Sequence, residues 1–212
     1  MPNFTRNGYG QVEPNQLSAQ KTGQIYASLP LNKDVQVLQN GEFMYYDYAT
    51  NQVTAEGKGE PMLVFNEIKL YEPFWQTSYK DFAMIRVGDN YVTSRLATEK
   101  YGDGSLTEGA TINPGHTEYQ YRMDGIAPRL FKTNIGDIYT TNMVATGVEY
   151  KAGDTLAPEV VETEYTAKDG STKTYKTMVL AKTAATEGML WVVGKVYTMP
   201  DGQPGLKIQR IQ

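Results

Sequence analysis

The chain of 212 residues is long enough to bury a substantial core in one large or two small domains. It contains no cysteine, which excludes disulfides, thiolate catalysis and cysteine-ligated metal sites. A net charge of −4 argues against broad electrostatic capture of nucleic acid or anionic lipid. No apolar run approaches the roughly 18 residues of a membrane-spanning helix, and no secretory signal is expected at the N-terminus.

Residues 1–33 differ in composition from the rest of the chain. They are rich in Asn, Gln and Gly, and their apolar residues are isolated, at Phe4, Tyr9, Val12, Leu17 and Ile25. The segment shows neither strand alternation nor a helical stripe, and alone it would bury too little apolar surface to offset its ordering entropy. Two interpretations stay open, a flexible tail and an extended arm that becomes ordered against a partner. The spaced apolar residues favour the arm.

Residues 34–125 are predicted to form a β-rich unit. The pair Asn40-Gly41 is a strong signal for a tight turn between strands. Within the run 62–71, Ile68 and Leu70 alternate with polar residues, as expected for a half-buried strand. The expected strands are 35–38, 43–48, 53–55, 62–71 and 82–87, the first three as a meander of hairpins.

Residues 126–212 are predicted to form a second β-rich unit with a projecting hairpin. Asp169-Gly170 supplies the turn between two polar arms, 162–167 and 172–177, which should extend into solvent or toward a partner. Helix signals are scarce, and the best short candidate, 184–187, is weak. The other expected strands are 142–144, 148–150, 178–181, 190–197 and 206–211, the last alternating until Arg210.

One phrase occurs twice. Residues 88–98 recur at 136–146 with an offset of 48, no gap and six identical positions of eleven. Both copies start with Gly-Asp and continue with β-formers, which indicates a turn leading into a strand. A duplicated unit, two equivalent strands in one sheet system and chance similarity all remain open. The fold class predicted from these patterns is mainly β, with one or two small β-barrel or sandwich units and an extended N-terminal arm.

The sequence offers no catalytic set. Its single histidine, His116, follows Pro-Gly and is expected to lie in a surface turn, which leaves no three-histidine metal site. Several aspartates adjoin glycines, but turn formation explains them and the spacing of a calcium loop is missing. A pair of carboxylates brought together from distant strands, as in glycosidases, stays open. We therefore expect no enzyme activity, metal or cofactor.

Three stretches resemble head decoration (cement) proteins of tailed bacteriophages: residues 3–11 with 17–25, residues 135–142, and residues 199–209. The resemblance covers about a third of the chain. It implies a non-enzymatic virion protein that is made in the host cytoplasm, binds the outer capsid surface and bridges major capsid subunits. It also implies self-association, with trimers as one form, and no direct contact with nucleic acid or membrane. The arm would bind the major capsid protein through Phe4, Tyr9, Leu17, Ile25 and Tyr26. Removing residues 1–30 should then abolish head binding and leave the β core folded.

Two other functions are compatible with the sequence. A tail or baseplate component would assemble into rings or tubes instead of binding heads. A carbohydrate-binding module on a virion or cell surface would stack sugars on exposed aromatic rings, with Trp75 as the first candidate among them.

Overall fold

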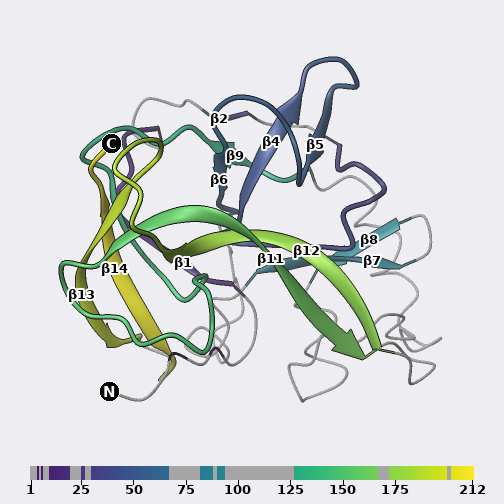
Figure 1. Cartoon of the computed structure of the whole chain (residues 1–212). Coiled ribbons are helices and arrows are strands. Elements are labelled where there is room, and N and C mark those ends of the chain that lie inside the picture. The colour runs from purple at the N-terminus through teal and green to yellow at the C-terminus, as the bar shows by residue number, and fades with distance from the viewer. Residues whose placement is uncertain are drawn as a thin grey trace, which may run out of the picture.

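The computed structural model describes residues 4, 6, 10–19, 25–26, 30–66, 82–87, 90–93, 127–166, 172–199 and 202–212. Nearly all regular structure within these residues is β, in fourteen strands (Figure 1). The predicted mainly β class is therefore confirmed.

The largest sheet has six antiparallel strands, and its order differs from the order of the chain. It runs β1 (Val12–Gln16), β10 (Ile138–Thr141), β14 (Pro204–Arg210), β13 (Trp191–Thr198), β11 (Thr155–Thr166) and β12 (Thr172–Lys182). The first strand of the chain thus forms one edge and pairs with β10, Val12 opposite Thr141. At the other edge, β11 and β12 continue as a long two-stranded ribbon that arches across the molecule (Figure 1).

Two smaller sheets complete the fold. One runs β2 (Ile25–Tyr26), β9 (Leu130–Phe131), β6 (Met62–Val64), β4 (Phe43–Asp47) and β5 (Gln52–Thr54), and the other runs β3 (Val37–Gln39), β7 (Ala83–Val87) and β8 (Asn90–Thr93). The β4–β5 hairpin is as predicted, but the expected meander is wrong at its start. The turn at Asn40-Gly41 leads from β3 into a different sheet, because β3 pairs with β7 and not with β4.

The six-stranded and five-stranded sheets share the main apolar core, and a second buried cluster joins residues of the five-stranded sheet to Leu38 and Met84 of the three-stranded sheet. Trp191 is completely buried between Tyr139 and Phe43, with ring centroids 5.1 and 6.2 Å away respectively. Phe4 and Leu17 belong to the same cluster, as do residues of β6, β9 and β14. The main core therefore takes side chains from all three predicted ranges, 1–33, 34–125 and 126–212, and β-pairing crosses both boundaries between them.

The structure corrects three local predictions. Residues 142–144 and 148–150 form no strand, and only an isolated bridge joins Val144 to Leu180. Residues 184–187 are not helical. The alternation of β14 does not break at Arg210, which is buried like Leu206 and Ile208; its guanidinium binds Thr133 and Glu60. A charged residue can occupy the inward position because those oxygens replace its water.

The repeated phrase forms a strand in both copies. β8 and β10 start 48 residues apart, at Asn90 and Ile138, but β8 is an edge of the three-stranded sheet and β10 is internal in the six-stranded sheet. Similar sequence therefore gives similar local structure in different sheets, which follows from the strand-forming composition of the phrase.

Candidate interaction surface

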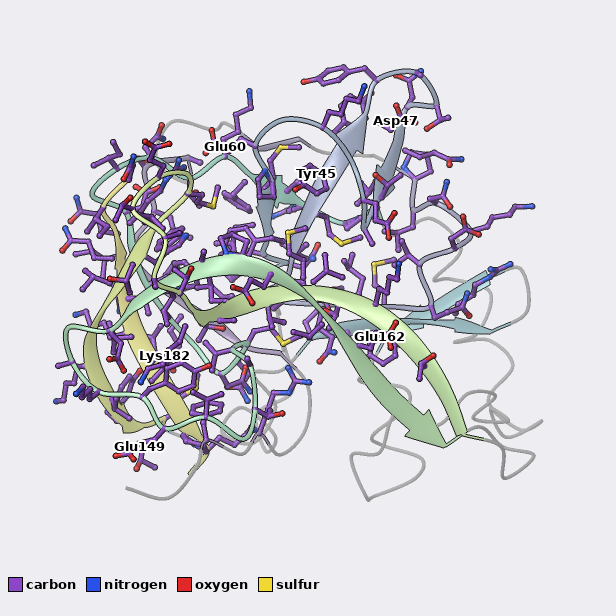
Figure 2. All side chains as sticks on the ribbon, in the orientation of Figure 1. Tyr45, Asp47, Glu60, Glu149, Glu162 and Lys182 are labelled. Carbon is purple, nitrogen blue, oxygen red and sulfur yellow. The ribbon has the colours of Figure 1, made fainter. Side chains whose placement is uncertain are left out.

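The β11–β12 ribbon is longer than the hairpin predicted from the sequence. Its register is unbroken from the pair Leu156–Lys182 to the pair Thr166–Thr172. Near the core its side chains are buried, as for Leu180, whereas Glu162, Thr174 and Lys176 farther along are exposed. Figure 2 shows Glu162 on this outer part of the ribbon. Between these exposed residues, Tyr175 and Thr177 are buried, and the Gln39 side chain donates to the Tyr175 hydroxyl. The polar arms expected from the sequence therefore have one exposed face and one packed face.

Pro158 reveals which backbone groups of β12 face outward. A proline has no N–H, so it occupies a position that makes no ladder hydrogen bond, and its partner Leu180 then turns its own N–H and C=O away from β11. Two contacts agree with this phase: the Ala145 N–H donates to the Leu180 carbonyl, and the Thr183 N–H donates to the Thr155 carbonyl. Hydrogen-bonded and non-hydrogen-bonded residue pairs alternate along an antiparallel ladder. Thr174 and Lys176 are therefore in the same kind of pair as Leu180 and also present their backbone N–H and C=O groups at the outer edge.

A groove of about 450 Å³ runs beside this edge. One wall is β12 itself, and the other comes from the turn before β3 and from the end of β5 with the residues that follow it. Val35 and Ala55 supply apolar surface, and the lining carries two carboxylates, Asp34 and Glu56, against one cation, Lys176. The full lining is Asn32, Asp34, Val35, Gln36, Thr54, Ala55, Glu56, Thr174, Tyr175 and Lys176.

An exposed ion pair spans the groove. The Lys176 Nζ lies 2.8 Å from the Glu56 Oε1, and Lys176 also sits opposite Glu162 in the ribbon. The hydrogen bond from Lys176, followed by its charge, lowers the pKa of Glu56. The same hydrogen bond and charge from Glu56, with a smaller effect of Glu162, raise the pKa of Lys176. Exposed pairs of this kind contribute little to stability, so Lys176 can exchange partners at low cost.

The turn between β4 and β5 presents a second exposed feature. Tyr48 is 71% exposed and contacts Tyr46 edge to face, with ring centroids 4.5 Å apart. The Tyr46 hydroxyl donates to the Asn51 side chain, and Asp47 accepts hydrogen bonds from the Ala49 N–H and the Thr50 hydroxyl. These contacts hold the turn in one shape, so Tyr48 projects from a fixed base. Figure 2 shows Asp47 at this outer end of the hairpin and Tyr45 nearer the core.

The structure places the predicted arm residues in different parts of the fold. Phe4 and Leu17 are buried in the main core, and Phe4 packs edge to face on Tyr150, with its backbone bonded to Val148 and Gly147. Ile25 and Tyr26 form β2 and pair with β9. Tyr9 lies outside the described residues, as do Trp75 and His116. In this structure Phe4 and Leu17 are bound within the chain, so truncation of residues 1–30 would also remove core side chains.

A buried polar cluster lies where the N-terminal segment meets β3 and β4. Glu42 is 1% exposed, and desolvation raises the pKa of its carboxyl to about 8. Contacts with Thr177 and Gln39 and the charge of Arg6 oppose that rise only in part. The guanidinium of Arg6 donates to the Met143 sulfur, and burial lowers its pKa. Sequence reasoning missed this cluster, because nothing in the local pattern distinguishes Arg6 or Glu42 from surface charges.

Within the described ranges, no group of three acidic, histidine or cysteine side chains could hold a metal ion. The same part of the chain has no helix long and apolar enough to cross a membrane. Comparison with family models, with curated proteins and with solved structures yields no match to this chain.

Proposed function

We propose that the protein is a structural virion component that binds the outer surface of a phage head and stabilises it by bridging major capsid subunits. The proposal starts from the resemblance of residues 3–11 with 17–25, 135–142 and 199–209 to head decoration proteins. The observation that supports it best is the β11–β12 ribbon, whose outer part exposes Glu162, Thr174 and Lys176 and carries a groove along its edge.

A ribbon of this kind suits a bridging role. It is anchored at one end by Leu156 and Leu180 in the main core, while Glu162, Thr174 and Lys176 remain exposed. A projection held by a rigid core can reach a neighbouring subunit without refolding. Self-association into trimers is part of the proposal, because linked copies on a symmetric shell turn modest individual affinities into strong total binding.

Co-sedimentation tests the proposal. The purified full-length chain is mixed with expanded heads that lack a decoration protein, and bound copies per head are counted against the concentration of free protein. Heads that are already decorated serve as the control. Saturable binding with a fixed copy number supports the proposal, and a solution mass of three chains supports the trimer. Absence of the chain from pelleted heads contradicts the head-surface role, and assembly into rings or tubes would instead indicate a tail component.

A carbohydrate-binding role is the second candidate, and Tyr48 is the observation that favours it. Its exposed ring sits on a fixed turn beside polar groups, as a sugar-stacking aromatic would. Glycan-array binding that is lost in Tyr48→Ala and retained in Tyr48→Trp would favour this role. Equal array signals for the wild type and Tyr48→Ala would reject Tyr48 as the sugar platform.

A further inference from the structure

The outer edge of β12 is an unfinished sheet edge. Thr174 and Lys176 each direct one N–H and one C=O away from β11, and neither has a backbone hydrogen-bond partner among the described residues. Exposed strand edges are templates for another strand, and proteins often block them with charged side chains or with covering loops. Here Lys176 stands at the edge but reaches across to Glu56, and both Thr174 and Lys176 line the groove.

The walls of the groove select the kind of strand that fits. Two β12 edges cannot approach each other easily, because the turn at residues 32–36 and the segment at 54–56 stand opposite the edge. A single extended segment can enter instead, with backbone bonds to Thr174 and Lys176 and side chains alternating toward the groove floor and toward solvent.

The charge of the lining selects the side chains of that segment. Asp34 is exposed and has no ion-pair partner within the described residues, and the Glu56 carboxylate is held only by an exposed lysine. A cationic side chain from a partner would neutralise Asp34 and could compete with Lys176 for Glu56. A partner carboxylate would add a third negative charge to the groove.

We propose that the edge of β12 at Thr174 and Lys176 binds a single extended, lysine- or arginine-bearing segment of a partner protein, which adds to the sheet as a further strand. This inference goes beyond the head-surface role and does not depend on it, because any protein with such a segment qualifies as the partner.

The test uses a defined peptide as the probe: the blocked, alternating hexapeptide acetyl-Thr-Val-Lys-Val-Thr-Val-amide, titrated into the isotope-labelled full-length protein. We expect saturable amide shift changes at Thr174, Lys176 and the groove lining, and a Kd below about 1 mM. A peptide with alternate backbone amides N-methylated cannot pair with the edge, and one with Glu in place of Lys reverses the charge. Each should bind at least tenfold more weakly.

A matched pair of variants tests the edge itself. Thr174→Pro removes an outward N–H without breaking the ladder to β11, and Val160→Pro removes an N–H of the same outward kind from the opposite edge of the ribbon. Far-UV circular dichroism is the control that checks whether both variants fold. Thr174→Pro should weaken peptide binding at least tenfold, and Val160→Pro should leave it unchanged. No saturable shifts with the lysine peptide, or equal binding of its N-methylated form, would overturn the proposal whatever the result with phage heads.

Discussion

At the scale of single residues, Glu42 shows how a position that looks like a surface charge can control stability. Burial favours its protonated form and raises the pKa in the folded chain to about 8, from 4.5 for an exposed glutamate. Because folding raises this pKa, the protonated Glu42 carboxyl makes its full contribution to the free energy of unfolding below pH 4.5. That contribution is lost as the pH rises through about 8.

We therefore predict that wild-type protein is less stable at pH 9 than at pH 5, by an amount on the order of 3 kcal/mol from this residue. Glu42→Gln keeps the shape and removes the ionisation, so its free energy of unfolding should vary less over that range and exceed the wild-type value at pH 9. Urea titrations at both pH values measure the difference. Glu187→Gln, at an exposed position, controls for the loss of one negative charge. Parallel pH profiles for the wild type and Glu42→Gln would contradict the prediction.

Gly41 allows a second prediction at the scale of single residues, and Gly136 serves as its control within the same chain. Gly41 and Gly136 have φ values of +90° and +93°, so alanine is strained at both. A Cβ at Gly41 would lie 2.6 Å from the Met143 Cβ, whereas a Cβ at Gly136 meets no atom within 4 Å. Gly136→Ala should cost about 1 kcal/mol for the left-handed backbone, and Gly41→Ala should cost roughly 1–3 kcal/mol more for overpacking. Thermal unfolding of the two variants decides, and equal losses would mean that the β3–β4 turn is free to move away from Met143.

At the scale of elements, β1 links the N-terminal segment to the stability of the whole sheet. Leu17 follows β1 directly and is 2% exposed in the main core, whereas its neighbour Gln16 is exposed. We predict that Leu17→Ala lowers the free energy of unfolding by about 2–5 kcal/mol and that Gln16→Ala leaves it nearly unchanged. Chemical denaturation measures both. A small effect of Leu17→Ala would favour the interpretation of residues 1–33 as an arm that becomes ordered against a partner.

The strands also show which parts of the fold could be predicted from the sequence. Alternation and turn signals located β4, β5, β7, β13 and both strands of the ribbon, because those signals depend on near neighbours. They could not show that β1 pairs with β10 or that β3 pairs with β7, since these choices depend on which faces are buried together across about 130 and 50 residues respectively. The groove was missed for the same reason: its two walls are about 120 residues apart at the pair Glu56–Lys176.

At the scale of the whole molecule, the shared core argues for a single cooperative unit. Trp191 from β13 contacts Tyr139 from β10 and Phe43 from β4, so separating the six-stranded sheet from the five-stranded sheet would open the main apolar cluster. Independent units at 34–125 and 126–212 would instead each retain a closed core. The shared cluster also makes the ribbon an extension of the same folded body, since Leu156 and Leu180 at its base belong to that cluster.

We predict one unfolding transition, in which the calorimetric enthalpy equals the van't Hoff enthalpy. In a Trp75→Phe variant, Trp191 is the only indole left and reports on the junction between the sheets. Its fluorescence and the far-UV circular dichroism should then follow the same curve against denaturant, because exposure of the Trp191 ring requires both sheets to come apart. Wild-type circular dichroism controls for any effect of the Trp75 substitution. Two resolved transitions, with the Trp191 signal following only one of them, would mean that one part of the chain stays folded after the shared core has opened, and the ribbon would then have to be tested as part of a separate domain.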